Sequence, residues 1–172
     1  MGKPGWKVDK AWSDRFISEI KSILGQVLIS EAPVEEDQKR NTDLLVLRLD
    51  SMRIACRVRK HPDKRYKIYR RQFTIRASRP SGTQTELAKI MAGWGDYIFY
   101  GIADPTEAYL CHWRIGNLEV FRGFARFTGC APGELIENHD RSSSFRIIDW
   151  DSMPPEFVIA KGGAREQRIF TT

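Results

Sequence analysis

The segment from Tyr97 to Ala103 constrains the fold of this chain more than any other stretch of the sequence. Its residues, YIFYGIA, are apolar on both of the alternating faces that a strand presents. Such a strand is typical of a sheet interior, where neighbouring layers cover both faces. The turn signal Asp104-Pro105 ends the run. The pattern therefore predicts a strand in the middle of a sheet.

Periodicity sets the order of the elements around this strand. Apolar residues at helical spacing follow Ser13, the expected N-cap, and a Thr83–Glu86 capping box opens a second helix that ends at Gly93. The expected elements are a helix over 13–30, two strands over 42–59 with a turn at Asp50-Ser51, a strand over 67–78, a helix from Thr83, strands over 97–103, 109–115, 145–150 and 157–160, and a short helix capped by Asn117. This order predicts an α/β fold with a mixed central sheet and flanking helices.

The segment from Arg53 to Arg79 is strongly basic. It holds eleven Lys/Arg and one acid, whereas the whole chain has 28 Lys/Arg and 22 Asp/Glu, so the other residues are acidic on balance. A positive field on one folded element favours a polyanionic partner, most simply DNA. The alternative is a sheet edge that its charges protect from pairing. The expected nucleic-acid contacts are Arg53, Arg57, Arg59, Lys60, Arg70, Arg71 and Arg76.

Composition excludes several classes of protein. A hydrophobic content of 41%, with five Trp, nine Phe and five Tyr, excludes a wholly disordered chain. The sequence has no apolar run of the roughly 18 residues that a membrane span needs, and its N-terminus lacks the apolar centre of a signal peptide. The three cysteines match neither a zinc spacing nor a disulfide framework. We therefore expect a cytoplasmic protein without a membrane partner.

The expected order, αβββαβ, resembles the core of the PD-(D/E)XK phosphodiesterase superfamily, which includes restriction endonucleases and recombination nucleases. In that family an acid opens one strand, and a Glu/Asp-X-Lys tripeptide follows on the neighbouring strand. Asp43 matches the leading acid, whereas the tripeptide position falls at Arg57-Val58-Arg59. The resemblance extends from Ser13 to Ala103. It implies a restriction-endonuclease-like core within residues 1–128, and residues 129–172 would form a C-terminal β extension on the same domain, with a frayed tail.

The resemblance also implies a Mg²⁺- or Mn²⁺-dependent nuclease that hydrolyses DNA. Arginine is never a metal ligand, so Arg57 and Arg59 would instead hold a phosphate through parallel hydrogen bonds. Some members of the superfamily place the missing acid or lysine on the helix after the third strand, where this chain has Glu86 and Lys89 on one face. The implied catalytic residues are therefore Asp43, Glu86 and Lys89, with Asp43 and Glu86 as metal ligands.

Plainer explanations exist for the same residues. Glu86 could serve only the capping box, Glu86 and Lys89 could form an ordinary surface pair, and Asp43 could mark the start of a strand. A two-residue turn at Asp50-Ser51 would place Asp43 opposite Val58, on the face away from the tripeptide arginines. Under that register only the helix residues could complete a metal site.

Three functions remain open from the sequence. The first is an active nuclease, and the second is an inactive nuclease-fold protein that binds DNA. The third is a protein–protein interaction module, such as an accessory protein of a phage or mobile element, with a basic surface for an acidic partner. A homodimer is compatible with each of them. Trp94, Trp113 and Trp150 could stack on bases, or they could belong to the core.

Overall fold

The computed structural model describes residues 6–31, 44–46, 52–79, 82, 84–140 and 142–163. The chain divides into two compact units, residues 1–52 and residues 53–172. The fold is mixed α+β. Among the described residues, no helix is both long enough and apolar enough to cross a membrane.

The N-terminal unit contains two helices and a two-stranded sheet. Its elements are α1 (Trp6–Asp14), α2 (Ile17–Leu28), β1 (Ile29–Glu31) and β2 (Leu44–Val46). The single helix expected over 13–30 is wrong at its start, because the amide of Phe16 bonds the carbonyl of Ser13 at 3.1 Å in a tight turn between the two helices. Ser13 therefore lies inside α1 and does not cap a helix. The apolar stripe itself is confirmed by the burial of Phe16, Ile20 and Ile23.

The strand β2 has a different partner from the one predicted. It pairs antiparallel with β1, so that Ile29 lies opposite Val46, and it does not form the expected hairpin with the strand at 54–59. A two-residue turn at Asp50-Ser51 would have paired residues 44–46 with the strand at 54–59. That pairing does not occur, because residues 44–46 pair with β1 instead. Asp43 itself and the Asp50-Ser51 turn lie outside the described residues.

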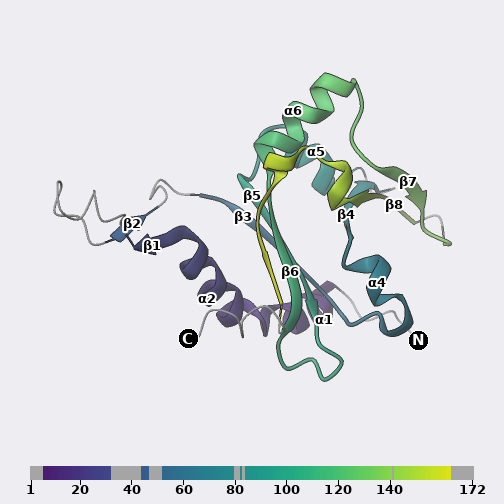
Figure 1. Ribbon diagram of the computed structural model, residues 1–172. Helices are drawn as coiled ribbons and strands as arrows, with labels where there is room; N and C mark the ends of the chain where they lie inside the picture. The colour runs from purple at the N-terminus through teal and green to yellow at the C-terminus, as the bar shows by residue number, and fades with distance from the viewer. Residues whose placement is uncertain are drawn as a thin grey trace. The chain divides into compact units, whose positions relative to one another are not determined.

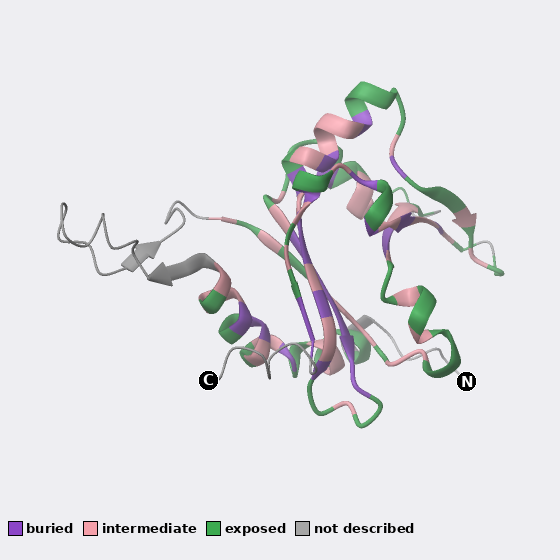
Figure 2. Cartoon of the chain, in the orientation of Figure 1, coloured by how far each residue is buried: buried purple, intermediate pink, exposed green. Residues whose placement is uncertain are grey.

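The C-terminal unit contains a four-stranded sheet with the order β3-β5-β6-β9 (Figure 1). Its strands are β3 (Ile54–Arg59), β5 (Tyr97–Ala103), β6 (Leu110–Asn117) and β9 (Val158–Gly162). The prediction of a central strand at 97–103 is confirmed, since β5 pairs parallel with β3 and antiparallel with β6. Figure 2 shows the buried residues that follow β5 and β6 along the sheet.

A second sheet of three strands has the order β4-β8-β7. Its strands are β4 (Gln72–Ser78), β7 (Glu134–Glu137) and β8 (Ser144–Asp149), with β8 antiparallel to both neighbours. The predicted strand over 67–78 is wrong in its first residues, because the short helices η1 (Asp63–Arg65) and α4 (Tyr66–Tyr69) precede β4. The αβββαβ order therefore does not form one sheet, since its third strand, β4, pairs within the described residues only with β8 of this second sheet.

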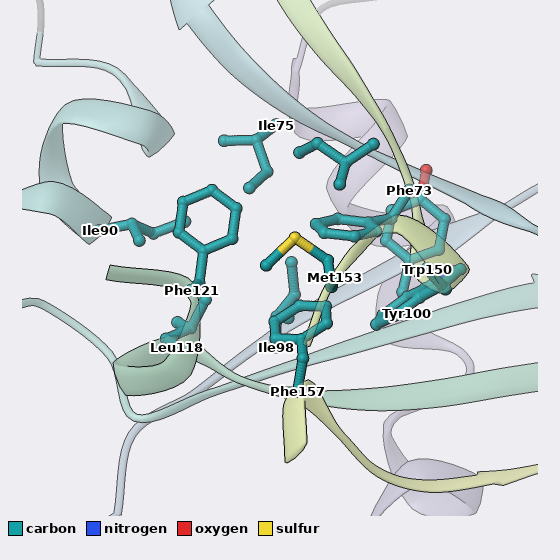
Figure 3. Close-up of a cluster of buried hydrophobic side chains, with 11 residues drawn as sticks. Phe73, Ile75, Ile90, Ile98, Tyr100, Leu118, Phe121, Trp150, Met153 and Phe157 are labelled. Carbon is teal, nitrogen blue, oxygen red and sulfur yellow. The ribbon is translucent and has the colours of Figure 1, made fainter. Parts of the chain in front are cut away.

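Helices join the two sheets through a shared core (Figure 3). They are α5 (Glu86–Met91), α6 (Leu118–Thr128), η2 (Trp150–Ser152) and η3 (Pro155–Phe157). The predicted cap of α6 is confirmed, since the Asn117 side chain accepts hydrogen bonds from the amides of Glu119 and Val120. The core combines Phe73 from β4, Tyr100 from β5 and Phe157 from η3. Residues after 128 thus complete both the sheets and the core.

Candidate functional site: a basic pocket

A basic pocket of about 470 Å³ lies at the start of β3, beside β4 and α5. The cationic residues that line it are Arg53, Arg57, Arg76, Arg79 and Lys89. Glu86 is the one acid among the described residues of the lining. Because the positive side chains outnumber the negative ones so clearly, the local field favours an anionic ligand.

Three short segments bring these side chains together. Arg53 immediately precedes β3 and lies on the same alternating face as Arg57 within it. Arg76 comes from β4, and Lys89 comes from the last turn of α5. The N-cap of α5 is Thr85, whose hydroxyl accepts a hydrogen bond from the Ala88 amide at 3.2 Å. The predicted capping box is therefore wrong, since Glu86 does not occupy its third helical position.

The Glu86 carboxylate is committed to contacts inside the protein. Its Oε2 atom accepts a hydrogen bond from Nη2 of Arg57 at 2.8 Å and another from the backbone amide of Arg76 at 3.2 Å. Nη1 of Arg57 donates to the carbonyl of Thr74 at 3.0 Å. Arg57 therefore ties β3 to β4 and α5, and its predicted contact with a phosphate stays a prediction.

The pKa of the Arg76 guanidinium is lower than usual, and burial and the neighbouring cations both contribute to this shift. Burial is the main cause that lowers the pKa of this guanidinium, and the neighbouring positive charges of Arg79 and Arg57 lower the pKa further. Glu86 acts in the opposite direction. One carboxylate thus does not offset the local positive charge, and a bound anion would relieve the repulsion.

An exposed tryptophan completes the lining. Trp94 follows α5 and is 59% exposed, whereas Trp113 and Trp150 are 8% and 3% exposed. The guanidinium of Arg53 lies over the Trp94 ring, 5.4 Å from its centroid. Of the three tryptophans that the sequence singles out, two therefore belong to the interior, and Trp94 remains available to a ligand.

The pocket collects some of the predicted contacts but not all of them. Arg53, Arg57, Arg76 and the helix pair Glu86 and Lys89 meet there. The other predicted arginines and lysine do not line it. Arg59 lies over the rings of Tyr69 and Tyr100, Lys60 forms an ion pair with Glu107, Arg71 pairs with Asp149 and Asp151, and Arg70 is exposed.

Sequence reasoning missed Arg79 as a site residue, although it closes the basic segment. Its charge was visible in the sequence, but its position beside Arg76 depends on how β4 ends. The role of Trp94 was also left open. The glycines on either side of it were the only local signal that this residue sits on a turn rather than in the core.

The described part of the pocket does not fit a divalent metal ion. Magnesium prefers several oxygen ligands, whereas Glu86 contributes a single carboxylate that already binds Arg57. No group of three or more His, Cys, Asp or Glu residues suited to a metal occurs within the described ranges. Asp43 lies outside these ranges, so its pairing with Glu86 stays a prediction.

Replacing Glu86 tests the structural role of its contact with Arg57. We expect Glu86→Gln to lower the free energy of unfolding by about 1–2 kcal/mol, because the hydrogen bond to a charged partner weakens and solvent screens part of the effect. Urea denaturation measures the change. Glu134→Gln removes an exposed acid on β7 and serves as the matched control. Equal stability of the two variants would show that the Arg57 contact contributes nothing.

Comparison with known proteins gives no relative of this chain: no family model, no curated protein and no solved structure matches it.

Proposed function

We propose that this protein binds nucleic acid and holds its phosphates in the basic pocket. The observation that carries the proposal is the charge of the lining, in which five cationic side chains meet one acid. That acid is already paired with Arg57. The pocket therefore keeps an excess of positive charge after its internal contacts are made.

The exposed cations of the lining are the ones suited to bind phosphate. Arg53, Arg79 and Lys89 are all exposed to solvent, so their charges can reach a ligand without first breaking the Arg57–Glu86 contact. Arginine binds a phosphate through two parallel hydrogen bonds, and lysine acts as a point charge. Contacts of this kind position a nucleic-acid backbone without reading its sequence.

The proposal favours binding without hydrolysis. The parallel pairing of β3 and β5, with α5 in the connection between them, occurs in α/β proteins of many functions and does not favour a nuclease. Hydrolysis with Mg²⁺ would need Glu86 to leave Arg57 and a second acid to join it. Binding needs neither change, so the inactive DNA-binding alternative accounts for more of the lining than the nuclease does.

The test is the salt dependence of binding to labelled DNA, followed by fluorescence anisotropy. Three phosphate contacts predict a slope of about −3 in log affinity against log salt for duplex DNA, since each contact contributes roughly −0.9. Polyglutamate serves as the competitor that distinguishes a general polyanion site from a nucleic-acid site. Absent binding, or a slope near zero, would overturn the proposal.

A second assay separates binding from catalysis. Plasmid DNA incubated with the protein and Mg²⁺ or Mn²⁺ is expected to remain uncut. Cleavage that disappears in Glu86→Ala would favour the nuclease instead, because it would require the carboxylate at the metal. Cleavage that persists in this variant would point to a contaminating enzyme or to another site.

A further inference from the structure

Trp94 is the feature of the pocket that phosphate binding does not explain. Large aromatic side chains usually bury most of their surface, yet this one is 59% exposed and lines the pocket beside the cations. A phosphate gains little from contact with an indole ring, whereas a nucleobase has a π-face that stacks on the ring. The pocket thus offers a second kind of contact next to the first.

The backbone holds Trp94 in a defined position. The amide of Trp94 donates to the Lys89 carbonyl, and the amide of Gly93 donates to the Ile90 carbonyl, both at 3.0 Å. With Gly93 at a φ of 91°, these bonds form a Schellman motif, which requires a residue that tolerates left-handed backbone. The tryptophan is therefore placed by the end of α5.

The residues after Trp94 are fixed as well. The Gly95 carbonyl accepts a hydrogen bond from Nη1 of Arg122 at 3.1 Å, and the Asp96 carboxylate accepts one from the backbone amide of Arg53 at 2.7 Å. The second of these bonds ties the loop of Trp94 to the start of β3, from which the Arg53 guanidinium extends over the ring. The backbone that carries the exposed indole is thus preorganised, which reduces the entropy lost on binding.

We infer that the pocket binds a single-stranded nucleic-acid segment, with one unpaired base stacked on Trp94 and the adjoining phosphates on Arg79 and Lys89. The inference rests on the proposed function and narrows its ligand. Bases within a duplex are stacked on their neighbours and cannot reach the ring, whereas an unpaired base can. The volume of about 470 Å³ is in the range of sites that hold one small ligand.

The experiment compares three ligands of equal length: a single strand of thymidine nucleotides, the same strand with abasic sites in place of its bases, and a duplex. We expect the wild type to bind the base-bearing single strand about tenfold more tightly than the abasic strand, which has the same phosphates, because stacking on one aromatic ring has roughly this effect. We also expect single-stranded DNA to bind more tightly than duplex DNA.

Variants assign the preference to the ring. Trp94→Ala is expected to abolish the preference for bases, so that this variant binds the base-bearing and the abasic strand with equal affinity, whereas Trp94→Phe retains most of the preference. Phe127→Ala removes an aromatic side chain that is 89% exposed on α6 and should change neither affinity. A preference that survives Trp94→Ala would overturn the assignment.

The outcomes distinguish this inference from the proposed function. Equal affinity of the wild type for the base-bearing and the abasic strand would overturn the stacking inference and leave phosphate binding intact. Failure of every strand to bind would overturn both.

Discussion

Phe157→Ala is expected to lower the free energy of unfolding by about 3–5 kcal/mol, the range typical of a buried phenylalanine that leaves a cavity. Phe157 is 0% exposed. Its ring lies 5.5 Å from that of Phe73 and 5.4 Å from that of Trp150. Because these neighbours come from β4 and η2, the ring fills the space between elements that are distant in the sequence.

The packing around Phe157 leaves little room for relaxation. A Cβ atom added at Gly116 would lie 2.6 Å from Cζ of Phe157, so the ring already touches the backbone of β6. The surrounding side chains also contribute to both sheets, which limits how far they can close over a cavity. These contacts place the expected loss toward the upper part of the range.

Urea denaturation measures the change in the free energy of unfolding, and two further variants serve as comparisons. Phe157→Leu keeps most of the volume and should cost less than the alanine change. Phe127→Ala removes an exposed ring and should change the free energy of unfolding by at most about 0.5 kcal/mol. A loss below about 1 kcal/mol for Phe157→Ala would contradict the central position of this ring in the core.

The double variant Arg79→Ala/Lys89→Ala is expected to weaken binding of duplex DNA about 60-fold at 0.1 M salt. The reason is counterion release, since each lost phosphate contact of slope roughly −0.9 costs about eightfold at this salt concentration. The slope itself should become less steep by about 2. Both side chains are exposed and line the pocket, so their removal should leave the fold intact.

A matched control separates a local site from the general charge of the protein. Lys64→Ala/Arg126→Ala removes the same two charges from exposed positions in η1 and α6, outside the pocket lining. This variant should lose at most a few-fold in affinity. An equal loss in both double variants would mean that DNA responds to the overall field of the protein rather than to the pocket.

The sequence predicted best those elements whose signal is local. The strand at 97–103 and the cap at Asn117 depend on neighbouring residues alone, and both are confirmed. The same reasoning failed where a distant segment decides the outcome. The strand expected at Leu44–Val46 is present, but its partner is β1, which no local pattern marked. The composition of residues 67–71 likewise predicted a strand, whereas the structure has the helix α4 at Tyr66–Tyr69.

The candidate site shows the same difference between local signals, which the sequence reveals, and distant contacts, which it does not. Its charge could be predicted from the sequence, because eleven cations in one segment exceed what a single acid can offset. The contacts that each cation makes could not be predicted from the sequence, since they depend on partners elsewhere in the fold. Arg57 binds Glu86, which is 29 positions away, and Arg71 pairs with Asp149. Trp94 became informative only when its exposure separated it from Trp113 and Trp150.

The late position of β8 and β9 has a consequence for synthesis of the chain. Within the described residues β4 pairs only with β8, and β6 lacks one neighbour until β9 is made. When β4 has just emerged from the ribosome, it is therefore an exposed strand, rich in β-branched and aromatic residues, whose partner β8 has not yet been made. Such strands are prone to aggregate during folding. The arginines that flank and interrupt β4 repel identical nascent chains, so the basic segment should also protect the protein before it is complete.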